Sequence, residues 1–372
     1  MRVLMIDDDP VSIKGVSDHC DEKGWDNRIS DFESAYKQLL EFDPDAVVLD
    51  WYDDADRTVA DPKETLGNSL LSLIWDRTFR PVIVFSGIAG TIEIDEKLKK
   101  CSMLKLLPKG EEDQVCLLLD KIEKVSNALS GFRSDMGAAL IESLNGMDKL
   151  INLEDVTCDA AEYVLEKRMA AYFDEKFISS LPPSWVQYLC PPIDNCLNVC
   201  DILVKKTERV EELCNPESYL LVLTPSCDLY CGHGRAPKVS DVLCAHCCGK
   251  EKALDSGLLD NLDAISENKL NSRIEKIERN LHAGYHEHYV PLPKFADVIP
   301  YMSVDLKKIV LLHLEIIATR EDNIDEKTGY VRVASVCSPF REQIVWAHLQ
   351  NSCRPGVPDR NTRMWAKGLL GK

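Results

Sequence analysis

The stretch Asp45-Ala46-Val47-Val48-Leu49-Asp50-Trp51-Tyr52 decides the fold of the first third of the chain. Its apolar run has the length of a buried strand and ends abruptly at the carboxylate of Asp50. In an open parallel α/β sheet, ligands bind beyond the carboxyl ends of the strands. Asp50 therefore stands where such a sheet carries its chemistry, provided that other strands also end in functional residues.

Residues 1–125 repeat the pattern of this stretch, because apolar runs of strand length alternate with amphipathic segments of helical length. Strands are expected at 2–6, 27–29, 47–50, 81–85 and 103–107, and helices at 11–23, 32–42, 66–75, 94–101 and 112–125. Alternating strands and helices predict an α/β fold, a doubly wound five-stranded parallel sheet with helices on both faces.

Functional side chains stand at four of the expected strand ends. Asp7 and Asp8 follow the first strand, Asp50 ends the third, Ser86 the fourth, and Lys109 follows the fifth. Right-handed βα units place these ends on one edge of the sheet. Three converging carboxylates repel one another unless a cation joins them, and oxygen ligands suit Mg²⁺. A divalent cation and a lysine beside a carboxylate predict a site for phosphoryl transfer.

Four motifs carry a resemblance to a known family. They are Ile6-Asp7-Asp8, Val48-Leu49-Asp50, Phe85-Ser86-Gly87 and Pro108-Lys109, in this order. With them, residues 1 to about 125 resemble a CheY-like receiver domain of a two-component response regulator. The resemblance implies that Asp50 accepts phosphate from a histidine kinase, with Asp7 and Asp8 holding Mg²⁺. It also implies that Ser86 is the switch hydroxyl and that Lys109 contacts the phosphoryl group.

The resemblance further implies that the backbone carbonyl of Tyr52 completes the Mg²⁺ shell. Two positions depart from the family pattern: Pro108 precedes the lysine, and Leu106 stands where the family usually has an aromatic residue. The alternative is a receiver-shaped adaptor that takes no phosphate and only mediates assembly.

Residues 126–180 are expected to form a helical connector. Helical patterns cover 125–150 and 153–177, and Pro182-Pro183 marks a boundary before a third domain at 181–372. Such a helix pair would transmit the state of the receiver, form a homodimer, or simply connect two domains.

Cysteines dominate the next part of the chain. Nine of the fifteen lie between Cys190 and Cys248, and the odd total disfavours a disulfide scaffold. Cys227 and Cys231 form a C-x3-C pair, and Cys244 and Cys247 a C-x2-C pair. Two close pairs separated by a loop predict a tetrahedral structural Zn²⁺ site. The alternatives are a site with one exchanged ligand and free buried thiols. The exchanged ligand would come from Cys248, His233 or His246, from the further C-x3-C pair Cys196 and Cys200, or from the histidine group His282, His286 and His288.

The rest of 181–372 predicts an α+β domain, with a long charged helix at 254–281, a strand at 330–336 and a helix opening at Ser338. Four motifs carry a resemblance: Ser226-Cys227-Asp228-Leu229, Tyr289-Val290-Pro291-Leu292-Pro293, Ser338-Pro339-Phe340-Arg341-Glu342 and Arg354-Pro355-Gly356-Val357-Pro358. With them, this region is similar to poorly characterised domains of bacterial conflict, or anti-phage defence, loci. We expect a zinc-stabilised output module under receiver control. The alternative is a hydrolase or nuclease that uses the cysteine and histidine residues of this region.

The formal net charge of −18 argues against nucleic acid as a partner of the whole chain. Residues 1–125 hold −11 of it, and a basic C-terminal tail with Arg354, Arg360, Arg363, Lys367 and Lys372 keeps a local nucleic-acid contact open. No apolar run approaches the about 20 residues of a membrane helix. The start of the chain turns acidic too early for a signal peptide, so we expect a cytoplasmic protein without a membrane partner.

Overall fold

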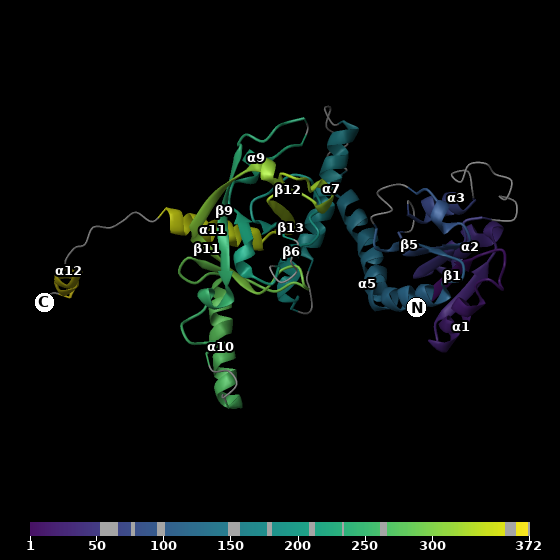
Figure 1. Ribbon diagram of the computed structural model, residues 1–372, viewed down its shortest axis with the longest axis horizontal. Helices are drawn as coiled ribbons and strands as arrows, with labels where there is room; N and C mark the ends of the chain where they lie inside the picture. The colour runs from purple at the N-terminus through teal and green to yellow at the C-terminus, as the bar shows by residue number, and fades with distance from the viewer. Residues whose placement is uncertain are drawn as a thin grey trace. The chain divides into compact units, whose positions relative to one another are not determined.

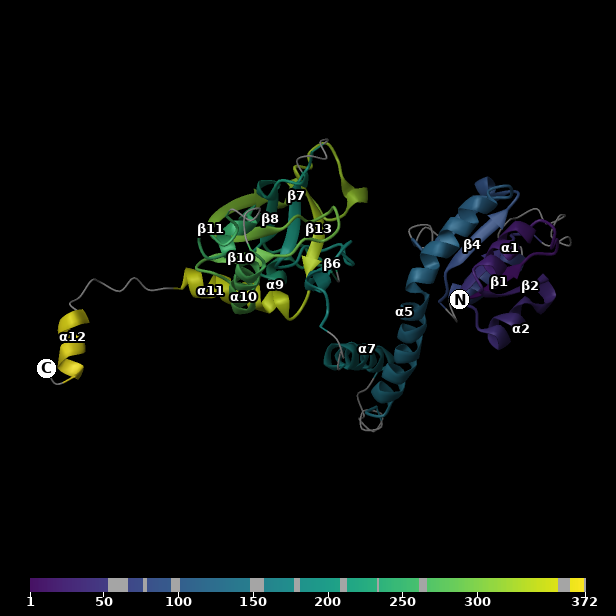
Figure 2. The ribbon, with the colours of Figure 1, turned by 90° about the horizontal axis from the view of Figure 1, so that it is seen from below.

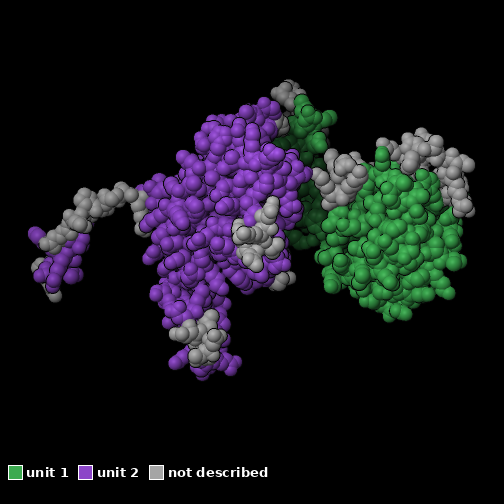
Figure 3. Space-filling view, in the orientation of Figure 1, with its two compact units in different colours: residues 1–177 green, residues 178–372 purple. Residues whose placement is uncertain are grey.

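The computed structural model describes residues 1–52, 66–75, 79–94, 101–147, 157–176, 181–207, 213–232, 234–260, 266–353 and 362–370. The chain divides into two compact units, residues 1–177 and 178–372, which Figure 3 distinguishes by colour.

The first unit contains a five-stranded sheet in which every neighbouring pair is parallel. Its strands are β1 (Arg2–Ile6), β2 (Asp26–Ser30), β3 (Ala46–Leu49), β4 (Val82–Ser86) and β5 (Leu104–Pro108). Their order is β2-β1-β3-β4-β5, which is the flavodoxin-like doubly wound order. The predicted parallel α/β fold is confirmed.

Helices cover both faces of this sheet because its strands are apolar on both sides. Helices α1 (Lys14–Glu22) and the start of α5 (Glu112–Leu144) pack on the face formed by Val3, Met5 and Val48. Helices α2 (Phe32–Phe42) and α3 (Leu66–Leu73) pack on the opposite face with Leu4 and Leu49. The expected helix at 94–101 falls almost wholly outside the described residues.

Helix α5 continues far past the sheet. It runs for 33 residues without interruption, so the expected domain boundary at residue 125 falls inside it. Helix α7 (Cys158–Glu175) packs against its second half, where Phe132 and Phe173 stack at 5.5 Å and Arg168 Nε donates to the carbonyl of Ser143 at 2.9 Å. Figures 1 and 2 show this continuation from the sheet to α7.

The second unit contains a mostly antiparallel eight-stranded sheet. The strand order is β10-β11-β9-β8-β7-β13-β12, and β6 also pairs with β13. The bounds are β6 (Tyr188–Leu189), β7 (Asp201–Lys205), β8 (Tyr219–Val222), β9 (Asp241–Gly249), β10 (Tyr289–Leu292), β11 (Met302–His313), β12 (Ile317–Ala318) and β13 (Tyr330–Val336). With its helices it forms the expected α+β region.

The described helices of this unit are α9 (Ser226–Leu229), α10 (Glu267–Ala283), α11 (Phe340–Ser352) and α12 (Thr362–Leu369). Helix α10 is shorter than the expected 254–281. Residues 254–260 form turns, and Gly257 has a positive φ of 79° that a helix does not contain. The helix ends at Gly284, which adopts the left-handed conformation typical of a C-terminal cap.

None of the helices in the described ranges combines the length and apolar character needed to span a bilayer.

Candidate functional site

The acidic residues at the ends of β1 and β3 come together. Strand register sets this arrangement, because Ile6 lies opposite Leu49 and Asp50 N donates to the carbonyl of Ile6 at 2.8 Å. Carboxylate oxygens of Asp7, Asp8 and Asp50 lie within 4.8 Å of one another. Asp7 is buried, Asp50 is half-buried and Asp8 is exposed, so the cluster opens to solvent on one side.

Lys109 joins this cluster from the end of β5. Its Nζ contacts Asp7 Oδ2 and lies 3.4 Å from Asp50 Oδ2. The same Nζ is 5.3 Å from the centre of the Phe85 ring. One ammonium therefore serves two carboxylates, which reduces their mutual repulsion. The other oxygen of Asp50, Oδ1, accepts a hydrogen bond from Trp51 N at 2.6 Å.

Ser86 occupies the strand end that the sequence pattern predicts, and Tyr52 is the residue whose backbone carbonyl the resemblance places in the Mg²⁺ shell. Ser86 is the last residue of β4, is 2 % exposed, and accepts a backbone hydrogen bond from Lys109 N at 3.2 Å. Tyr52 follows Asp50 by two residues and packs partly buried against the core of that sheet face.

Ser12 belongs to the same cluster and was missed by the sequence reading. Its Oγ accepts from Lys109 Nζ at 2.6 Å and lies 2.8 Å from Asp7 Oδ2. The residue sits in the loop between β1 and α1, where its hydroxyl also lies 2.8 Å from the carbonyl of Asp9. A serine in a polar loop carries no pattern that separates this role from an ordinary turn.

The residues of this edge fit a hard divalent cation. Three carboxylates supply oxygen ligands only, and one of them is exposed, which leaves room for water in the coordination shell. Elsewhere in the described residues, no group of three or more histidine, cysteine or acidic side chains brings its ligand atoms so close together.

The structure does not bring the four predicted zinc ligands together. Cys231 is bonded to Cys196 in a disulfide, with the two Cα atoms 5.8 Å apart. Cys244 and Cys247 both lie on β9, three residues apart, and successive strand residues point to opposite faces. Accordingly, Cys244 packs with Leu203 and Leu220 on one face.

Cys247 packs in the core on the other face of the sheet, with Leu221 and Ala245. Cys227 is exposed. Burial raises the pKa of the Cys244 thiol to about 12 and that of Cys247 still further, so both are neutral hydrophobic groups. Of the alternative ligands, Cys248 and His246 belong to no group of three or more side chains whose ligand atoms lie close enough together to hold a metal ion. His233 lies outside the described residues.

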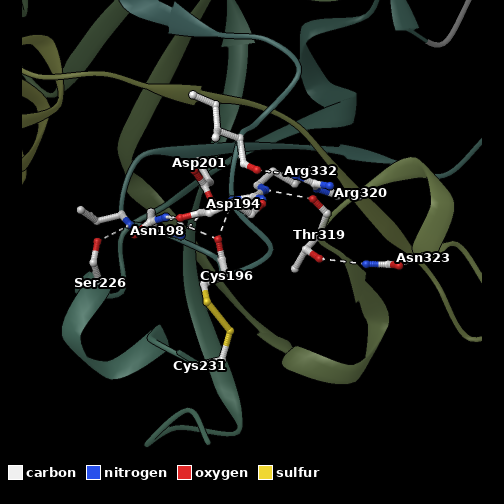
Figure 4. A network of polar contacts seen from close by, with 12 residues as sticks. Asp194, Cys196, Asn198, Asp201, Ser226, Cys231, Thr319, Arg320, Asn323 and Arg332 are labelled. Carbon is white, nitrogen blue, oxygen red and sulfur yellow. Dashed lines mark hydrogen bonds and ion pairs between the residues drawn. A yellow bond between two sulfur atoms is a disulfide. The ribbon is translucent and has the colours of Figure 1, made fainter. Parts of the chain in front are cut away.

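A buried arginine organises the region beside the disulfide, as Figure 4 shows. Arg332 on β13 is 1 % exposed, and its NH1 lies 2.9 Å from Asp194 Oδ1 and 3.1 Å from Asp201 Oδ2. Its Nε donates to the carbonyl of Thr319 at 3.0 Å, and NH1 also donates to the carbonyl of Cys196. This network ties the loop before β7 to β13 and engages the Arg332 guanidinium and Asp201 Oδ2.

Comparisons with known proteins bear on the first unit. No family model matches the chain, and no curated protein matches it. Among solved structures, the N-terminal domain of a response regulator/sensory box/GGDEF 3-domain protein from Carboxydothermus hydrogenoformans is 14% identical, with a TM-score of 0.28. The match covers 34% of this chain and 98% of that one.

A signal receiver domain of a putative Luxo repressor protein from Vibrio parahaemolyticus is also 14% identical, with a TM-score of 0.27 over 34% of this chain and 92% of that one. NtrX from Brucella abortus, in complex with ADP, is 18% identical, with a TM-score of 0.27 over 46% of this chain and 41% of that one. The fold of the first unit is established by its strand order and its two helical layers.

Proposed function

We propose that the chain is a response-regulator-like signalling protein in which Asp50 accepts a phosphoryl group from a histidine kinase. One observation carries the proposal: Asp7, Asp8, Asp50 and Lys109 meet at the carboxyl edge of a doubly wound sheet. The output under control would be the second unit, and the proposed setting is the cytoplasm. The defence role suggested by the sequence of that unit stays a prediction.

The chemistry assigned to Asp50 is a nucleophilic displacement. A carboxylate oxygen of Asp50 attacks the phosphorus of a phosphohistidine, an O–P bond forms, the N–P bond breaks, and the departing imidazole takes up a proton. The ammonium group of Lys109, which pairs with Asp7 and Asp50 in the structure, would then contact a phosphoryl oxygen. Ser86, at the end of the neighbouring strand, would donate its hydroxyl to another.

A divalent cation would be held by Asp7, Asp8 and Asp50 together with the backbone carbonyl of Tyr52. When bound, Mg²⁺ supplies positive charge that offsets the carboxylates and the transferring phosphoryl oxygens. Asp7 is already fixed for this role, because Oδ1 accepts from Asp9 N at 2.9 Å and Oδ2 is engaged by Ser12 and Lys109.

The test is labelling of the purified chain with acetyl phosphate in the presence of Mg²⁺, followed by intact mass spectrometry. We expect the addition of one phosphoryl group, which Asp50→Asn removes and chelation of Mg²⁺ prevents. Asp18→Asn serves as the matched control, because Asp18 is an exposed acid on α1 away from the cluster. An unmodified protein that takes no label would instead support the adaptor, and equal labelling of Asp50→Asn would exclude Asp50 as the acceptor.

A further inference from the structure

A cavity in the second unit has the composition of a ligand site and takes no part in the chemistry at Asp50. Its volume is about 540 Å³, within the range of about 300–1,000 Å³ that small-molecule sites occupy. It lies at the base of α10, which Figure 1 shows projecting away from the sheet. Three elements form its apolar walls: β10 with Val290 and Leu292, α10 with Ile277 and Leu281, and α11 with Ile344.

Polar side chains are the minority in this cavity, and five of them line it: Ser184, Gln187, Lys250, Tyr301 and Gln343. Gln187 lines it and is only 9 % exposed, and its Nε2 makes no hydrogen bond of ordinary geometry with the described residues. The amide lies near enough to Tyr188 to oppose the rise in that phenol's pKa caused by burial. A buried amide donor without an acceptor is unfavourable, and a ligand oxygen would supply one.

The charge of the cavity is positive although the chain is strongly acidic. Lys250 is the one charged side chain among the lining residues, and no described carboxylate forms a salt bridge with it. Its Nζ lies 5.7 Å from the centre of the Tyr301 ring, which also lines the cavity. An apolar chamber with an amide donor and a single ammonium matches a molecule with an apolar body and an anionic head.

We infer that this cavity binds a small organic carboxylate with an extended apolar body, of the kind represented by a medium-chain fatty acid. The apolar body would occupy the space between β10, α10 and α11. The carboxylate would accept hydrogen bonds from Lys250 and Gln187. This ligand class goes beyond the phosphoacceptor function and does not depend on it.

The probe is decanoate, with 1-decanol as an uncharged analogue of equal chain length, and binding to the full chain is measured by isothermal titration calorimetry. Leu281→Trp fills the cavity from α10 at a half-exposed position and should weaken decanoate binding at least about tenfold. Leu270→Trp is the matched control, because Leu270 is similarly exposed on the same helix but does not line the cavity. It should bind as the unmodified protein does.

The head-group assignment has its own pair of variants. Lys250→Met should weaken decanoate about tenfold, the usual size of one charge-assisted hydrogen bond, and leave 1-decanol within about twofold. Lys252→Met, which changes a neighbouring lysine outside the cavity lining, should change neither. Circular dichroism of each variant establishes that it is folded before its affinity is compared.

Three results would overturn the inference. The first is the absence of any decanoate binding up to millimolar concentration. The second is equal affinity for decanoate and 1-decanol, which would remove the anionic head from the ligand class. The third is decanoate binding that arises only after deletion of residues 354–372. That result would show that these residues, and not a small molecule, occupy the cavity in the full chain.

Discussion

The parallel sheet of the first unit and the antiparallel sheet of the second treat neighbouring residues in opposite ways. In the parallel sheet, Asp7, Asp50 and Lys109 are far apart in sequence, yet their strands end on one edge and the side chains meet. In the antiparallel sheet, Cys244 and Cys247 are close in sequence, yet β9 sends them to opposite faces. Topology, rather than spacing along the chain, decides which reactive groups can act together.

The largest expected loss of stability comes from substituting Arg332 in the second unit. Arg332→Met leaves Asp201, which is fully buried, without its partner, and should lower the free energy of unfolding by about 3–5 kcal/mol. Urea unfolding followed by circular dichroism measures the loss. Acetyl phosphate labelling of Asp50 should persist, because the first unit contains none of these groups.

The double variant Arg332→Met/Asp201→Leu is the control for this prediction. Removing both charges should recover most of the loss, since the cost comes from a single unpaired buried charge. A loss below about 1 kcal/mol in the single variant would contradict the prediction, because it would show that Asp201 does not need Arg332 to compensate its charge.

The Cys196–Cys231 disulfide gives the next largest effect. Its loop of 35 residues suggests that Cys196→Ser/Cys231→Ser lowers stability by about 2–4 kcal/mol under oxidising conditions. Reduction of the unmodified protein should produce the same loss. Cys227→Ser is the control, because Cys227 is an exposed free thiol close by in sequence. An equally large loss of stability in Cys227→Ser would indicate that Cys227 and Cys231 belong to one site, as the zinc prediction proposed.

Alkaline pH should lower the stability of the second unit, because its cores bury thiols. Burial raises the pKa of Cys200 and of Cys244 to about 12 each, from about 8.5 in an unfolded chain. Between these values the unfolded state has lost a proton that the folded state keeps, so stability falls as pH rises. The expected slope is up to about 1.4 kcal/mol per pH unit for each thiol.

The measurement for this third effect is urea unfolding at pH 8, 9 and 10. Cys244→Ala should flatten the slope, whereas Cys227→Ala should not, because its thiol is exposed in both states. Equal slopes in all three proteins would mean that the Cys244 thiol ionises as readily in the fold as outside it.

Ser12 carries the smallest predicted effect and tests the edge where distant residues meet. Ser12→Ala removes the hydroxyl that accepts from Lys109, and the initial rate of acetyl phosphate labelling should fall about three- to tenfold. Ser12→Thr should retain most of the rate. Ser17→Ala is the control, because that hydroxyl bonds Asn27 outside the cluster; an unchanged rate in Ser12→Ala would limit Ser12 to a turn.

The predictability of each region follows from the same difference. Strand ends in a parallel sheet are visible in the sequence as apolar runs that stop at a polar residue, which is why Asp50, Ser86 and Lys109 could be placed at strand ends from the sequence. Ser12 was not, because a loop hydroxyl has no periodic signal. The spacing of the cysteine pairs predicted a zinc site that the structure does not bring together. Spacing alone does not reveal whether a segment is a loop, as such a site needs, or a strand such as β9.

Helix α5 extends well beyond the sheet of the first unit. It begins three residues after Lys109 and is still helical at Leu144, about 50 Å along its axis. On the way, Arg133 passes within 3.7 Å of Asp45, at the opposite end of β3 from Asp50. A straight rod of this length turns a tilt of about 5° at its first turn into a displacement of about 4 Å at its far end. A tilt of α5 beside Lys109 would therefore displace the segment against which α7 packs.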